Sequence, residues 1–114
     1  MSRVNRPFVG IPSFLRSRIV ENIGELDAAI AILGVPFDEG SPFLPGSRLG
    51  PRALREHSLR FASDGRGYYD PETRREYLVE EMAQGLIADV GDVDIPPANA
   101  ERTFANITEA VRGI

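Results

Sequence analysis

A short, almost entirely apolar run constrains the fold of this chain more than any other feature. The run covers residues 28–35 (AAIAILGV) and is followed by Pro36. Because apolar and polar residues do not alternate within it, and because it is short for a helix, it predicts a strand covered on both faces, as in a parallel sheet. Pro36 has no backbone N–H to donate, so the strand should end there.

The pattern that follows predicts alternation of helices and strands. A helix should begin at Pro51, because proline at the first helical position has a preset φ and loses no needed donor. A second apolar run at 86–93 predicts another strand, and Asn99 is a good N-cap for a last helix. This strand–helix–strand–helix order is typical of the opening of an α/β domain.

Each predicted helix has an apolar stripe that should face a sheet. In the first helix the stripe consists of Leu54, Ser58 and Phe61, and in the last helix it consists of Phe104, Ile107, Val111 and Ile114. On another face of the first helix, Arg52 and Glu56 have the i,i+4 spacing of an ion pair.

Three other segments lack a clear helical pattern. Residues 1–25 are expected to form an irregular arm, and residues 63–67 a loop. Residues 68–79 allow two interpretations. They form two short strands around a type I turn at Asp70–Thr73, or a helix that Asp70 caps with Pro71 first inside it. The tyrosines at both ends favour the hairpin.

Composition excludes several function classes. The chain has 114 residues, which suits one domain at most, and its net charge of −4 argues against a nucleic-acid surface. All 13 basic residues are arginines, so a Walker loop and a Schiff-base lysine are excluded. There is no cysteine, and His57 is the only histidine. The sequence contains no signal peptide or membrane span, which predicts a cytoplasmic protein without a membrane partner.

Two ordered motifs carry a resemblance to a known family. The first runs from Gly34 to Arg55 and contains Pro-Phe-Asp at 36–38, Gly-Ser at 40–41, Pro-Gly-Ser-Arg-Leu-Gly-Pro at 45–51 and Leu-Arg at 54–55. The second is Ile-Ala-Asp-Val-Gly-Asp-Val-Asp at 87–94. Together they resemble the agmatinase branch of the ureohydrolase superfamily, which includes the arginases. The resemblance covers residues 7–114, although Phe43-Leu44 replace the aromatic-Arg pair of many agmatinases.

The resemblance implies the fold and the activity of a complete enzyme. It implies the N-terminal part of a three-layer αβα fold with a mostly parallel sheet, in which residues 1–25 are an arm and residues 26–114 supply the first strands and helices. A complete relative would use two Mn²⁺ ions to hydrolyse a guanidino compound to urea and an amine, as a trimer or hexamer. Agmatine is the first expected substrate; guanidinobutyrate, free guanidine and other linear guanidino acids are the alternatives.

The family's metal ligands lie in three later motifs, Gly-Gly-Asp-His, Asp-Ala-His-x-Asp and Asp-x-Asp-x-x-Asp-Pro, none of which occurs in this sequence. We therefore expect neither catalytic nor metal-binding residues here, and no activity from the chain alone. Asp89, Asp92 and Asp94 suggest either a Mn²⁺ or Mg²⁺ site or, as we favour, solvation and pairing with arginine. In a regular strand Asp92 and Asp94 would share a face that Asp89 does not. His57 is expected to pack against a neighbouring element.

The loop after the first predicted strand is the best candidate for a contribution to function. In open α/β sheets, ligands bind beyond the carboxyl ends of the strands. One wall of a substrate mouth is therefore predicted from Phe37, Asp38, Glu39, Ser41, Phe43 and Arg48, with a packed structural loop as the alternative. Arg48 would contact a substrate carboxylate or a neighbouring subunit or, as we favour, fasten its own loop.

A different class of function is also open. The chain would then be a non-catalytic protein that associates with a full-length ureohydrolase or with itself through the apolar stripe of its last helix. A reading frame that continues into Gly-Gly-Asp-His would favour a fragment of an enzyme over this alternative.

Overall fold

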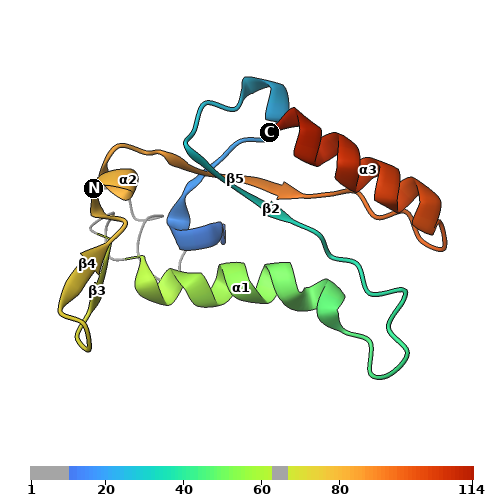
Figure 1. Cartoon of the computed structure of the whole chain (residues 1–114), viewed down its shortest axis with the longest axis horizontal. Helices are drawn as coiled ribbons and strands as arrows, with labels where there is room; N and C mark the ends of the chain where they lie inside the picture. Colours follow the sequence, from blue (N-terminus) through green and yellow to red (C-terminus); the bar gives the residue numbers. More distant parts are fainter. Residues whose placement is uncertain (1–10, 63–66) are drawn as a thin grey trace.

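A small parallel sheet with a helix on each face organises the chain. The computed structural model describes residues 11–62 and 67–114. Strands β1 (Arg18–Ile19), β5 (Ile87–Asp92) and β2 (Ile30–Gly34) pair in the order β1-β5-β2, all parallel. Helices α1 (Gly50–Ser58) and α3 (Ala100–Gly113) lie on opposite sides of these strands (Figure 1). The predicted α/β class, with the layers and parallel sheet of an arginase-like N-terminal part, is confirmed.

The two apolar runs form the strands that the sequence predicts, and β5 lies at the centre of the sheet. Ile30 of β2 lies opposite Ile87 of β5, and Ala31 lies opposite Ala88. Ala88 is fully buried, which agrees with the lack of alternation in its run. Among the residues that the structure describes, the buried hydrophobic side chains are those of Leu59, Ala62, Ile87, Ala88 and Val93.

The prediction of an irregular arm at residues 1–25 is wrong for its second half. Residues 1–10 lie outside the described part of the chain, but Phe14–Arg16 and Ile23–Glu25 form 3-10 turns, and β1 lies between them. Two residues are too short a run for an apolar pattern, so this edge strand depends on tertiary pairing with β5.

A hairpin occupies the ambiguous segment, as favoured from the sequence. Strands β3 (Tyr68–Asp70) and β4 (Arg75–Tyr77) pair antiparallel. Asp70 closes the turn, because its side chain accepts hydrogen bonds from the backbone of Glu72 and the hydroxyl of Thr73. A short helix, α2 (Val79–Ala83), follows the hairpin and was not predicted. Of the predicted loop at 63–67, residues 63–66 lie outside the described chain.

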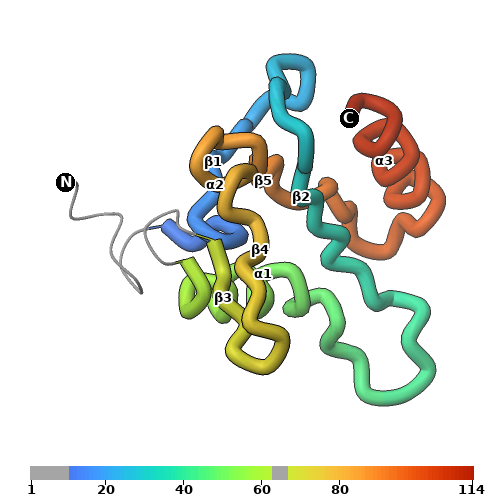
Figure 2. Tube along the Cα trace, turned by 60° about the vertical axis from the view of Figure 1, so that its left-hand side comes forward, coloured from blue at the N-terminus to red at the C-terminus, as the bar shows by residue number. Residues whose placement is uncertain are grey.

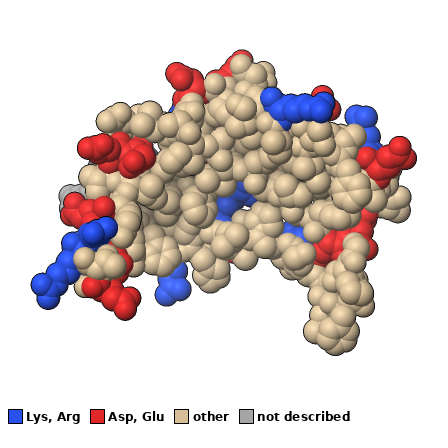
Figure 3. Space-filling model, viewed as in Figure 1, with Lys and Arg blue, Asp and Glu red and all other residues tan. Residues whose placement is uncertain are grey.

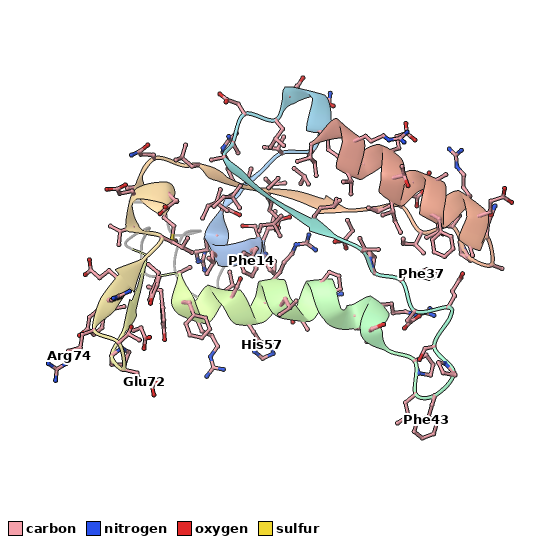
Figure 4. The ribbon with its side chains drawn as sticks, viewed as in Figure 1. Phe14, Phe37, Phe43, His57, Glu72 and Arg74 are labelled. Carbon is pink, nitrogen blue, oxygen red and sulfur yellow. The ribbon has the colours of Figure 1, made fainter. Side chains whose placement is uncertain are left out.

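The apolar stripe predicted for the first helix is only partly correct. Ser58 is buried, but Leu54 is 65% exposed and Phe61 is 47% exposed. The helix continues into a 3-10 turn at Leu59–Phe61, and its tighter winding brings Leu59 inward instead. The prediction that His57 packs against a neighbour is also wrong, because His57 is exposed and points away from the sheet (Figure 4).

The last helix begins as predicted but buries a different stripe. The side chain of Asn99 accepts a hydrogen bond from the backbone N–H of Arg102, which confirms the N-cap. Thr103 is fully buried and Ile107 is half-buried, whereas Phe104, Val111 and Ile114 are more than half exposed. None of the helices within 11–62 and 67–114 combines the length and apolarity that a membrane crossing requires.

Candidate functional site at the carboxyl ends of the strands

The loop that leaves β2 is fastened by a buried carboxylate. The side chain of Asp38 is 1% exposed, whereas that of Arg48, at the far end of the loop, is 57% exposed. Arg48 Nε donates to Asp38 Oδ1 at 2.7 Å, and its backbone N–H donates to Oδ2 at 3.2 Å. The backbone N–H of Ser41 also donates to the carbonyl of Asp38. Asp38 thus joins both ends of a ten-residue loop.

The electrostatics of this pair keep Asp38 ionised. Hydrogen bonding from the Arg48 guanidinium is the main reason that the pKa of Asp38 lies below its usual value, and it outweighs the opposing effect of burial. The same contact raises the pKa of Arg48. Arg48 therefore fastens its own loop, which is the favoured of the roles considered for it.

The other predicted mouth residues divide into an anchored base and an exposed tip. Phe37 contacts the Phe104 ring of α3 edge to face, with ring centroids 5.5 Å apart. Glu39 Oε1 accepts a 2.9 Å hydrogen bond from the backbone N–H of Ala98, so the loop after β2 is tied to the loop after β5. Phe43, by contrast, is 78% exposed at the tip of the loop (Figure 4).

Ser41 belongs to the exposed tip. Its hydroxyl donates to the carbonyl of Phe43, which shapes the turn. The structure thus brings Phe37, Asp38, Glu39 and Arg48 together as a fixed base and extends Ser41 and Phe43 beyond it. The role of these six residues in a substrate mouth stays a prediction.

A second carboxylate cluster lies on the α1 side of the sheet, and Arg55 is at its centre. Arg55 forms a bidentate ion pair with Asp89, in which the Nε–Oδ2 distance is 2.8 Å and the Nη2–Oδ1 distance is 3.0 Å. Its third nitrogen, Nη1, lies 2.6 Å from Asp92 Oδ1, and Nη2 also donates to the carbonyl of Gly91. The side chains of Arg55 and Asp89 are 12% and 3% exposed. The pairing of these carboxylates with arginine is therefore confirmed for Asp89 and Asp92.

This geometry corrects the prediction that Asp89 and Asp92 point to opposite faces. The register between β2 and β5 shifts, since Ile32 lies opposite Asp89 while Gly34 lies opposite Asp92. Two residues of β2 thus span the same distance as three of β5, which is a β-bulge. Gly91 within the bulge has φ of +80°, a conformation that glycine adopts without a steric penalty. The bulge turns both carboxylates toward Arg55.

The Asp89 carboxylate accepts four hydrogen bonds from the described residues and is held in its charged form. Beyond Arg55, the backbone N–H groups of Phe14 and Gly91 each donate to it at 2.9 Å. Burial on its own would raise the pKa of Asp89, but the hydrogen bonds from Arg55, Phe14 and Gly91 outweigh it and place the pKa below the usual range. The main cause of the raised pKa of Arg55 is its hydrogen bond to Asp89.

These contacts decide whether the carboxylates suit a metal ion. Asp38 is paired with Arg48, and Asp89 and Asp92 share the single guanidinium of Arg55, so each of these carboxylates already has an oxygen bonded to arginine. Within the described residues, no group of three or more histidine, cysteine, aspartate or glutamate side chains is placed to hold a metal ion. The described residues thus do not fit the Mn²⁺ pair that the resemblance implies for a complete enzyme.

Arg55 belongs to the first sequence motif, but its bonds to the two aspartates were not predicted. Its spacing could have indicated them, because Pro51, Arg55 and Ser58 lie on one face of a helix, the face that packs toward the sheet. Ser58 supports the same cluster, since its hydroxyl accepts a hydrogen bond from the backbone N–H of Leu15 beside Phe14. A separate shallow hollow on α3, lined by Phe104, Ala105, Thr108, Glu109 and Arg112, does not include the predicted mouth residues.

Comparison with known proteins identifies a family whose members are consistent with this parallel α/β fold. Residues 28–114 match the model of the arginase family. The chain is 35% identical over 111 residues to the mitochondrial guanidino acid hydrolase of Homo sapiens, which covers 97% of this chain and 28% of that protein. It is 34% identical over 115 residues to the mitochondrial agmatinase of Gallus gallus, a match that covers 97% of this chain and 29% of that protein. It is 35% identical over 113 residues to the guanidinobutyrase of Pseudomonas aeruginosa, and that match covers 92% of this chain and 28% of the relative. The chain spans somewhat over a quarter of the length of these relatives, and it belongs to the arginase family.

Proposed function

We propose that these 114 residues are the N-terminal part of an agmatinase-like ureohydrolase, which hydrolyses a guanidino compound to urea and an amine. The observation that carries the proposal is the family match together with relatives named guanidino acid hydrolase, agmatinase and guanidinobutyrase. Agmatine is the first substrate that we propose, followed by guanidinobutyrate and guanidine.

We assign the described residues to shaping the site rather than to the reaction itself. The Asp38–Arg48 contact and the tie from Glu39 to the backbone of Ala98 fix the base of the loop at the carboxyl ends of β2 and β5. The exposed ring of Phe43 is then available to stack on a planar guanidinium group, a contact that favours cations. This supports a role in substrate choice.

The cofactor proposed for the complete protein is a pair of Mn²⁺ ions, whose chemistry is to lower the pKa of bound water. Because Asp38, Asp89 and Asp92 already bond to arginines, we assign the ligands to residues other than those described. We also propose that the complete protein is a cytoplasmic homo-oligomer, as the family resemblance suggests.

The proposal is tested by urea release. Residues 1–114 alone, supplied with Mn²⁺ and agmatine, guanidinobutyrate or guanidine, should release no urea above a metal-only blank. A polypeptide that continues this region through the length of its relatives should release urea from at least one of the three. Failure with all three compounds would refute the proposed reaction, and activity of residues 1–114 alone would refute the placement of the chemistry.

The role of the loop has its own test in that longer polypeptide. Phe43→Ala should raise KM or change the ratio of kcat/KM between agmatine and guanidinobutyrate, while bound Mn²⁺ stays constant. Leu49→Ala, which removes another exposed apolar side chain beyond the loop, is the matched control. A loss of Mn²⁺ from the folded Phe43 variant would show that the loop belongs to the metal site instead.

A further inference from the structure

Within the part of the chain that the structure describes, Glu39 is the one charged residue of the predicted mouth whose charge no other side chain matches. Asp38 and Arg48 form an ion pair at 2.6 Å. Among the described residues, the Glu39 carboxylate has a single hydrogen-bond partner, the backbone N–H of Ala98, which donates to Oε1 at 2.9 Å. An amide donor leaves the negative charge in place, and Glu39 is exposed. A fixed carboxylate therefore remains beside a neutralised pair.

The position of this carboxylate is set by two neighbouring strands. Because β2 and β5 run parallel, the loops that follow them leave the same edge of the sheet, the edge at which ligands of open α/β sheets bind. In Figure 2 the segment that leaves β2 passes beside the segment that joins β5 to α3. Ala98 has φ of +56°, a conformation that is unfavourable for alanine, and its N–H is directed at Glu39. The Glu39 side chain is thus held between the two loops.

Neither loop supplies a cation to offset Glu39. Besides Glu39, the loop after β2 carries only the Asp38–Arg48 pair, in which the charges cancel. In the loop after β5, residues 93–99, the only charged side chain is that of Asp94. Figure 3 shows acidic atoms just above the uncharged tip of the loop after β2, which projects at the lower right of the view. A mouth at this edge would therefore carry a negative potential.

The two leading substrate candidates differ in the charge of the end that does not react. Both carry a guanidinium group at one end, but agmatine ends in an ammonium group and guanidinobutyrate ends in a carboxylate. A fixed carboxylate at the mouth attracts the first compound and repels the second, so one residue changes the selectivity in two ways. The ring of Phe43 cannot make this distinction, because the guanidinium that it would stack on is common to both.

We propose that Glu39 is a specificity-determining residue, which favours guanidino compounds with a cationic far end over those that end in a carboxylate. The inference deepens the proposed function and rests on it, because it assigns the substrate class of the same site. Glu39 takes no part in the hydrolysis itself, since it acts on the end of the substrate that lies away from the reacting carbon. The competing role is purely structural, in which Glu39 only fastens its loop to Ala98.

The test separates the charge of Glu39 from its hydrogen bond, in the longer polypeptide of the urea-release assay. Glu39→Gln keeps a carbonyl oxygen that can accept from Ala98 and removes only the charge. We expect kcat/KM to fall for agmatine and to rise for guanidinobutyrate, so that the ratio of the two falls about fivefold. Glu80→Gln is the matched control, because Glu80 is exposed on α2, which precedes β5 and lies at the other end of the sheet. It should leave the ratio unchanged.

A purely structural role predicts a different pattern. If kcat/KM changes by the same factor for both compounds in Glu39→Gln, or if Glu80→Gln shifts the ratio equally, the proposal is overturned. Ionic strength gives a second measurement on the unaltered polypeptide, which does not depend on the folding of a variant. Because salt screens exposed charges, kcat/KM for agmatine should fall relative to that for guanidinobutyrate as salt is added, and an unchanged ratio would contradict the proposal.

The same assay distinguishes this inference from the function on which it rests. Release of urea from neither compound would refute the proposed reaction, and this inference with it. Release of urea with a ratio that is insensitive to Glu39→Gln would leave the proposed reaction intact and refute only the role of Glu39.

Discussion

Removal of Arg55 should destabilise the fold more than removal of any exposed arginine. Arg55→Met keeps most of the side-chain volume but leaves Asp89, 3% exposed, without its ionic partner. Loss of one partner of a buried ion pair costs about 3–5 kcal/mol. We expect the lower end, about 3 kcal/mol, because the backbone N–H groups of Phe14 and Gly91 still donate to Asp89.

Arg52→Ala is the matched control on the same helix. Its i,i+4 contact with Glu56 joins side chains that are 81% and 49% exposed, so its loss should cost less than about 0.5 kcal/mol. Urea unfolding followed by circular dichroism measures both changes. With a slope of roughly 1–3 kcal/mol per molar urea, Arg55→Met should lower the midpoint by roughly 1–3 M. Adding Asp89→Asn to Arg55→Met should recover part of the loss, because the unpaired charge is removed. Equal costs for the two arginines would refute the assigned role of the cluster.

Three further results are expected. In the folded chain the pKa of Asp89 is below its usual value of 3.8, so its contribution to stability is complete above pH 3.8 and is lost as the pH falls further. The free energy of unfolding should therefore differ less between pH 6 and pH 3 in Asp89→Asn than in the unaltered chain. Gly34→Ala should cost about 1–3 kcal/mol, because a Cβ would overlap Asp92 Oδ1, whereas Gly40→Ala meets no atom within 4 Å and should be nearly neutral in the same unfolding assay. Titration calorimetry of the isolated chain with Mn²⁺ should show no site tighter than roughly 10⁻⁴ M; a tight stoichiometric site would contradict the pairing of its aspartates with arginines.

The parts of the fold that follow from the sequence are those in which local pattern and tertiary environment agree. The apolar runs at β2 and β5 form strands as their composition predicts, and the first three residues of β5 are buried. The expected cover on both faces is not met by β2, in which Gly34 is buried, Ile30 is exposed and the residues between them are partly exposed. The cap at Asn99 and the turn at Asp70 are likewise local, because each side chain bonds to backbone groups within a few residues. Strand β1 has no such local signal, since its pairing with β5 joins segments about seventy residues apart.

The candidate site was predictable in position but not in its contacts. The loop after β2 was located by the rule that ligands bind beyond the carboxyl ends of strands, and a structural role for Arg48 followed from its chemistry. The partner of Asp89 was not predictable in this way. A two-residue period assigns Asp89 and Asp92 to opposite faces, and only the extra residue of the bulge brings both to the α1 side.

The bulge also explains why one helix can stabilise the end of the sheet on which the proposed site depends. Arg55 bonds to Asp89 before the bulge, to the carbonyl of Gly91 within it and to Asp92 after it. A regular strand would present only one of these aspartates to α1. Asp92 leads into the loop that contains Ala98, whose backbone N–H donates to Glu39. The path of that loop therefore starts from a strand end that Arg55 of α1 holds. A change at Arg55 should therefore alter the geometry of the loop without touching a substrate.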